Sequence, residues 1–133
     1  MDEILRQIEK FHGHLGPYVV LGYKMGEIAN KILGKDFFSK NAIVFSGINP
    51  PLSCIIDGVQ MSSGCTLGKG NIKVNNDGLA KTKFSNNNGK KIEITLKSNI
   101  KDEIDTSVTE ENIIDYSKKL FQKSDDELFY IVR

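Results

Sequence analysis

The longest stretch of helical periodicity in this 133-residue chain runs from Pro17 to about Leu33, and it constrains the fold more than any other segment. Proline suits the first position of a helix, and Gly34 supplies a stop signal at the other end. Gly22 and Gly26 lie inside the helix, where each costs about 1 kcal/mol relative to alanine. Something must therefore approach this face closely, either a neighbouring helix or sheet of the same chain or a second copy in a homodimer.

Short apolar runs bounded by turn signals predict a sheet. Four of them are residues 42–46, 72–75, 79–85 and 91–97. The last three are separated by Asn76–Gly78 and Asn86–Gly89, and because Asn and Gly tolerate positive φ, these turns predict an antiparallel meander. A fifth run, residues 128–132, has no polar interruption and predicts a strand in the interior of the sheet.

Two further helices are predicted around these strands. Residues 2–10 have apolar positions at helical spacing, and Ser107 and Glu110 have the spacing of a capping box ahead of a second amphipathic segment. We find no internal repeat and no linker. The simplest interpretation is one α+β domain that spans residues 1–133.

Charge and hydropathy exclude several classes of partner. The 18 basic and 17 acidic residues leave a net charge of +1, so no overall field favours nucleic acid or an anionic membrane surface. The chain has no signal-peptide pattern and no uncharged apolar run of about 18 residues, so we expect a cytoplasmic protein. A domain of this length buries enough core to fold without a metal, so any metal is expected to serve a function.

The two cysteines, Cys54 and Cys65, lie on either side of an apolar helix predicted at residues 51–62. Cys54 and Asp57 are three residues apart on that helix, so a thiol and a carboxylate can face the same pocket. Cys65 follows the helix stop signal Gly64. Two thiolates and a histidine from elsewhere can begin a zinc site, whereas plain packing is the alternative, because free cysteine is among the most buried residue types.

The two histidines, His12 and His14, lie just before the long helix. Their spacing of two residues cannot place both on one helix face, but a looped or extended segment can present them together. A structural or solvent-exposed histidine is the alternative interpretation for each.

Several common enzyme motifs are absent from the sequence. The segment Gly64–Gly70 resembles a phosphate loop but has three rather than four residues between its glycines, and glycine replaces the magnesium-binding Ser or Thr. GxSxG, CxxC, HExxH and the dinucleotide fingerprint are also missing. The turn near Lys69 can still bind an anion through backbone amides, with the lysine as a point charge or simply solvated.

Three motifs together resemble the E-subunit family of formylmethanofuran dehydrogenase. They are Phe11-His-Gly-His-Leu-Gly-Pro17, Cys54-x-x-Asp57-x-x-Gln60 and Gly64-Cys-Thr-x-Gly-Lys-Gly-Asn71. The resemblance covers at least residues 11–85. It implies an α+β core with a mixed, largely antiparallel sheet of about five strands flanked by helices, a homodimer, and an active site that can hold zinc.

Two departures from the family pattern stand out. Many relatives have cysteine where this chain has Gly16, and many carry a C-terminal zinc finger, whereas this sequence ends at Arg133. We therefore expect one thiol fewer in the core site and no structural zinc ribbon.

The resemblance also implies roles for individual residues. By motif position, the zinc ligands are His14, Cys54 and Cys65, with His12 as an alternate, and three protein ligands leave the open position that is typical of catalytic zinc. Cys65 and Asp57 are the candidate catalytic residues. The candidate cofactor- or substrate-binding residues are Gln60, Thr66 and Lys69.

Two functional hypotheses follow. The first is a metal-binding accessory protein or subunit in one-carbon, methanogenesis-related metabolism, with formylmethanofuran dehydrogenase subunits as partners. The second is a self-standing enzyme that uses zinc-activated water or Cys65 on an unknown small substrate. We favour the first because the chain offers no clear general base beyond Asp57 and His12. The chain also has no recognisable apparatus for the tungsten or molybdenum cofactor, so we assign it no part of the redox chemistry. A domain whose motif residues only pack is the third interpretation.

Overall fold

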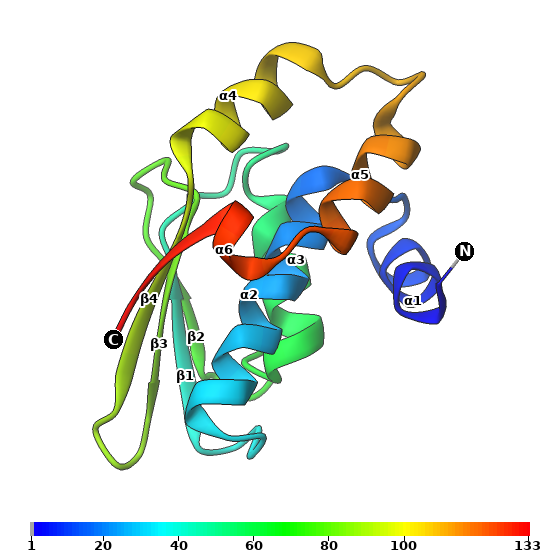
Figure 1. Ribbon diagram of the computed structural model, residues 1–133. Coiled ribbons are helices and arrows are strands. Elements are labelled where there is room, and N and C mark those ends of the chain that lie inside the picture. The colour runs from blue at the N-terminus through cyan, green and yellow to red at the C-terminus, as the bar shows by residue number, and fades with distance from the viewer. Residues whose placement is uncertain (1) are drawn as a thin grey trace.

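The computed structural model describes residues 2–133 and contains helices and one sheet (Figure 1). In chain order the elements are α1 (Glu3–His12), α2 (Pro17–Leu33), β1 (Lys40–Val44), α3 (Cys54–Ser63), β2 (Ile72–Val74), β3 (Lys81–Asn86), β4 (Lys91–Leu96), α4 (Ser98–Ser107), α5 (Ile113–Gln122), α6 (Asp125–Leu128) and β5 (Phe129–Val132). The predicted α+β class, with a mixed and mostly antiparallel five-stranded sheet, is confirmed.

The strand order is β2-β1-β3-β4-β5, and it corrects the predicted meander. β3 and β4 form the expected antiparallel hairpin, but β2 pairs in parallel with β1, with Ala42 opposite Ile72. The reason is the helix between them: α3 crosses over and returns the chain in the direction of β1, as parallel pairing requires. β2 therefore lies at the sheet edge and not beside β3.

The prediction of an interior position for residues 128–132 is also wrong, because β5 forms the opposite edge and pairs only with β4 among the described strands. The residues of β5 are apolar, but only one face of this strand is buried. The Tyr130 side chain is 59% exposed and that of Val132 is 60% exposed.

One face of the sheet packs against helices, and this face forms the core. Side chains alternate along the strands, so that Phe84, Ile92 and Ile94 are fully or almost fully buried while their neighbours are half-exposed. In Figure 1, α2 runs along this face with α3 beside it. Together they place the start of α2 and the start of α3 at the same end of the molecule, next to α1.

Glycine on both sides allows α2 and α3 to pack closely, and theirs is the most extensive contact between two elements. A Cβ added to Gly22 would lie 2.2 Å from the Ile55 carbonyl oxygen, and one added to Gly58 would lie 2.1 Å from that of Val19. The structure thus favours the neighbouring-helix explanation for Gly22 and Gly26. The homodimer stays a prediction, without support from these glycines.

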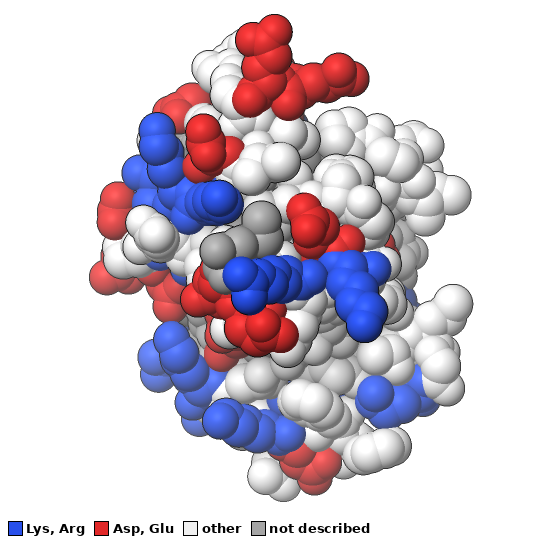
Figure 2. Space-filling view, turned by 90° about the vertical axis from the view of Figure 1, so that its right-hand side faces the viewer, with Lys and Arg blue, Asp and Glu red and all other residues white. Residues whose placement is uncertain are grey.

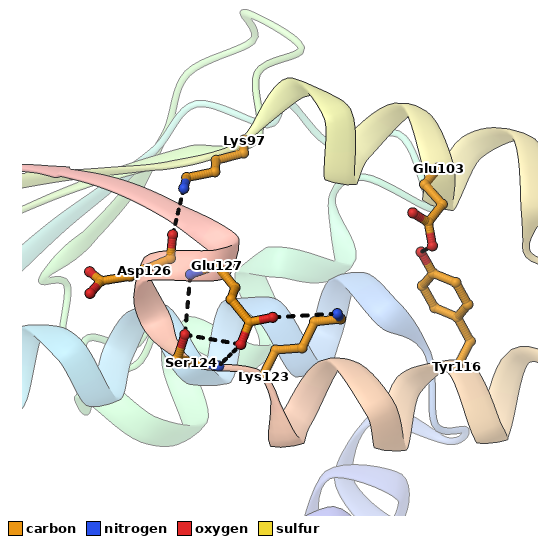
Figure 3. Close-up of polar contacts among 7 residues, drawn as sticks. All are labelled: Lys97, Glu103, Tyr116, Lys123, Ser124, Asp126 and Glu127. Carbon is orange, nitrogen blue, oxygen red and sulfur yellow. Dashed lines mark hydrogen bonds and ion pairs between the residues drawn. The ribbon is translucent and has the colours of Figure 1, made fainter.

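Two local features of the C-terminal third differ from expectation. The capping box predicted at Ser107 is wrong, because Ser107 is the last residue of the unpredicted helix α4. The capping box that forms is at α6, where Ser124 accepts from the Glu127 amide and Glu127 accepts from the Ser124 amide (Figure 3). Lys97 donates to the Asp126 carbonyl oxygen and so joins the end of β4 to α6.

Over the described residues, every helix is too short or too polar to span a membrane.

Candidate functional site

A cavity of about 920 Å³ opens where the end of α1, the start of α2, the loop before α3 and the segment from α4 to α5 meet. We call it the His–Cys cavity, because His12, His14 and Cys54 are among the residues that line it. Most of its other lining is apolar and comes from different parts of the chain: Leu15, Pro17, Val19, Pro50, Pro51, Ile104, Val108, Ile113 and Ile114.

His12 is fixed by a short hydrogen bond to Asp57. The distance from His12 Nδ1 to Asp57 Oδ2 is 2.6 Å. A carboxylate that is ionised only accepts hydrogen bonds, so against such a carboxylate Nδ1 is the donor, and Nε2 is the ring nitrogen left to a metal in the neutral tautomer. A carboxylate behind a ring nitrogen is the arrangement that orients metal-binding histidines in proteins. The predicted catalytic carboxylate thus contacts the predicted alternate ligand.

His14 and Cys54 also line the cavity. The rings of His12 and His14 lie edge to face with their centroids 4.9 Å apart, and His14 is exposed. Cys54 is half-buried at the first turn of α3, one helical turn before Asp57. Gly16 lies beside His14, since a Cβ at this position would be 3.0 Å from Cε1 of His14.

Burial, reinforced by the negative charge of Asp57, raises the pKa of the Cys54 thiol. The charged thiolate is the form that both effects disfavour, so the metal-free protein holds a neutral thiol here. We expect alkylation of Cys54 by iodoacetamide, in the presence of a chelator, to be slower at pH 8 than alkylation of a free cysteine peptide. Its rate should keep rising above pH 9.

The control for this measurement is Cys54→Ala, which should show almost no alkylation while folded, because Cys65 is fully buried. A rate that levels off near pH 7 would contradict the raised pKa.

Cys65 lies at the other end of α3. The helix has ten residues and so spans about 15 Å, with Cys54 at its first position and Cys65 two residues beyond its last. Burial raises the pKa of the Cys65 thiol, against opposing effects of the Ser63 hydroxyl and the charges of Lys40 and Lys69. Cys65 is not among the residues that line the His–Cys cavity, so the structure does not bring it to the histidines. In residues 2–133, no three His, Cys, Asp or Glu side chains are already grouped closely enough to hold a metal ion.

None of the predicted cofactor-binding residues lines the cavity: Gln60 lies in α3, and Thr66 and Lys69 lie in the loop and turn that follow it. The Gln60 side chain accepts from the Leu67 amide, and the Thr66 hydroxyl accepts from the Lys69 amide. Lys69 Nζ lies 5.5 Å from the centre of the Phe38 ring. Several backbone amides that could cradle an anion are thus already used within the turn.

The outer wall of the cavity, formed by α4 and α5, was missing from the sequence-based site. Tyr18 donates to Asp105 Oδ1 at 2.6 Å. Tyr116 donates to Glu103 Oε1 at 2.7 Å, as Figure 3 shows. Burial and the accepting carboxylate raise the pKa of both tyrosines. The one sequence signal for this wall is Tyr18, which directly follows the histidine motif.

The charges near this wall are mainly acidic. Figure 2 looks onto the side that carries α1 and α5, and acidic side chains gather at its top, where Figure 1 places α4 and the loop after it. Elsewhere in this view acidic and basic side chains are interspersed. The acidic residues of this region are Asp102, Glu103, Asp105, Glu110 and Glu111.

Comparison with known proteins places the chain in a family. A family model described as "FmdE, Molybdenum formylmethanofuran dehydrogenase operon" matches residues 11–130. The chain belongs to the FmdE family. The match includes all three motifs and every residue that lines the His–Cys cavity except Glu9, which precedes it.

Two individual proteins resemble this FmdE-family chain. The solved structure of a tungsten formylmethanofuran dehydrogenase FmdE-like protein from Syntrophus aciditrophicus has a TM-score of 0.72 at 20% identity, covering 98% of this chain and 69% of that one. This likeness shows a shared fold. An Archaeoglobus fulgidus protein, named "Probable S-adenosyl-L-methionine-binding protein", is 35% identical over 74 residues, which are 54% of this chain and 20% of that protein. The matched region thus spans about a fifth of this curated relative.

Proposed function

We propose that this FmdE-family protein binds a zinc-class metal ion in the His–Cys cavity and acts as an accessory protein or subunit in one-carbon metabolism. The observation that carries the proposal is that His12, His14 and Cys54 all line one large cavity, with Asp57 hydrogen-bonded to His12. Two imidazoles and a thiol are ligands that zinc prefers.

The residues fit such an ion chemically, although their side chains must reorient to hold it. His12 would offer Nε2, the exposed His14 would offer a ring nitrogen, and Cys54 would bind once its thiol loses a proton. A zinc ion with three protein ligands keeps one position for water and makes that water more acidic. The geometry at Gly16 supports the same location, because the cysteine of many relatives would lie against His14.

The proposed partners are formylmethanofuran dehydrogenase subunits, and the support for them is the operon named in the family description. We propose a homodimer from the family resemblance alone. Light scattering at micromolar concentration tests the dimer, and copurification with the dehydrogenase subunits tests the complex.

The experiment that tests metal binding is elemental analysis of protein purified without a histidine tag. We expect close to one zinc-class ion per chain, and we expect His14→Ala to lose most of it because the cavity then keeps only two donors. Full occupancy in a His14→Ala, Cys54→Ala double variant would contradict the proposal.

A second candidate is a self-standing enzyme, and the size of the His–Cys cavity favours it. About 920 Å³ is far more than a metal ion needs and lies within the range of small-molecule sites. Asp57 and His12 would then form an acid–base pair. Zinc-dependent hydrolysis of an activated ester that disappears in Asp57→Asn would favour this candidate over the accessory role.

A further inference from the structure

The charge of the His–Cys cavity points to the class of ligand that it takes. The described residues that line it include no lysine and no arginine, but they include Glu9, Asp105 and Glu110. A cavity lined by one sign of charge and low-dielectric walls raises the local concentration of oppositely charged ligands. The cavity therefore disfavours phosphates and carboxylates.

Two of the three carboxylates are available to a ligand. Asp105 is already paired, with Lys101 Nζ 2.6 Å from Oδ2 and Tyr18 on Oδ1. Glu9 and Glu110 form no ion pair with any lysine or arginine in residues 2–133. Glu9 lies on α1 one turn before His12, and Glu110 lies in the loop between α4 and α5. The uncompensated charges thus come from two separate elements of the lining.

The rest of the lining supplies a matching apolar surface. Ile104 of α4, Val108 directly after it, Ile113 of α5 and Pro50 of the loop before α3 line the same cavity. Apolar walls with a few polar groups are typical of sites that bury most of a small ligand. A ligand that satisfies both features has an apolar body and a positively charged head.

We propose that the His–Cys cavity binds a cationic amphipathic small molecule, an ammonium-type head on an apolar body, and that Glu9 and Glu110 select it against anions. This inference names the ligand class of the site in the proposed function. The role of the ligand rests on that function. The preference for a cation over an anion comes from Glu9 and Glu110 and needs no metal.

Benzyltrimethylammonium and benzylsulfonate are suitable probes, since they share an apolar body and carry opposite charges. The quaternary ammonium has no lone pair, so it cannot bind by coordinating a metal. Chelator-treated full-length protein is titrated with each probe at low ionic strength and followed by amide NMR. We expect the cation to bind at least about tenfold more tightly, with shifts at His14, Cys54 and Ile113.

The variants assign the selectivity to the two carboxylates. Glu9→Gln combined with Glu110→Gln should bring the two affinities within about threefold of each other. Glu111→Gln is the matched control, because Glu111 is exposed, adjacent in sequence and outside the lining, and it should keep the preference.

Equal or tighter binding of benzylsulfonate, no binding of either probe at millimolar concentration, or an unchanged preference in the double variant would each overturn the inference. The proposed function fails separately. If the protein takes up no zinc yet prefers the cation, the selectivity stands and the metal role falls, and if zinc binds without the preference, only the selectivity falls.

Discussion

Replacing Gly58 with alanine is expected to destabilise the protein by about 3 kcal/mol, although alanine is the better helix former by about 1 kcal/mol. The new methyl group would lie 2.1 Å from the Val19 carbonyl oxygen and 2.4 Å from the Tyr23 amide nitrogen. Both are backbone atoms of a buried helix, so the clash cannot be relieved by rotating a side chain. The two helices must move apart, and the apolar contacts between them are lost with the movement.

Urea unfolding followed by circular dichroism measures this change, with Gly68→Ala as the control. Gly68 has no atom within 4 Å of an added Cβ and no positive φ, so its replacement should change the free energy of unfolding by less than about 0.5 kcal/mol. A Gly58→Ala protein as stable as the wild type would show that α2 and α3 are not packed as described.

The second large effect concerns the two cysteines. We expect Cys54→Ala to lower the affinity for zinc by about a hundredfold or more, because it removes the single thiol that lines the His–Cys cavity among the described residues. Cys65→Ala should leave the affinity within about threefold, because Cys65 lies beyond the opposite end of α3. The two variants remove the same group and differ only in its position.

Competition with a chromophoric chelator at pH 7.5 gives both affinities, and the unfolding midpoint of each variant shows whether the fold is intact. Cys65→Ala is expected to lower the stability, because Cys65 is a fully buried member of the core. Equal loss of zinc in both folded variants would contradict the cavity as the metal site and restore the ligand set predicted from the motifs.

The sequence predicts those parts of the fold that local chemistry determines. α2 begins at Pro17 and ends before Gly34 as expected, because proline and glycine act through their own backbone. Cys54 and Asp57 are close enough in α3 for the carboxylate to raise the thiol pKa, as the helical spacing indicates. The hairpin of β3 and β4 follows from its Asn-Gly turn.

The sequence does not predict the features that depend on distant contacts. α4 has Ile100 and Ile104 as its main apolar contacts, which is too few for a clear periodicity. The pairing of β2 with β1 depends on the crossover through α3 and not on either strand. For the site, the second and third motifs are adjacent in sequence, but the ten-residue helix α3 places their two thiols at its opposite ends. Helix length argues against a shared ligand set, since the ten residues of α3 span about 15 Å.

The attachment of α4 has a consequence for the timing of ligand exchange. This helix forms part of the outer wall of the His–Cys cavity, yet it is held mainly by Ile104 and by hydrogen bonds from Tyr18 and Tyr116. Elements with few buried contacts open locally at a small fraction of the global free energy of unfolding. We therefore expect a bound molecule to leave by brief opening of this wall, while α2 and α3 stay closed. The residence time of the bound molecule would then depend on how often the hydrogen bonds of Tyr18 and Tyr116 to α4 break, and not on the global stability of the protein.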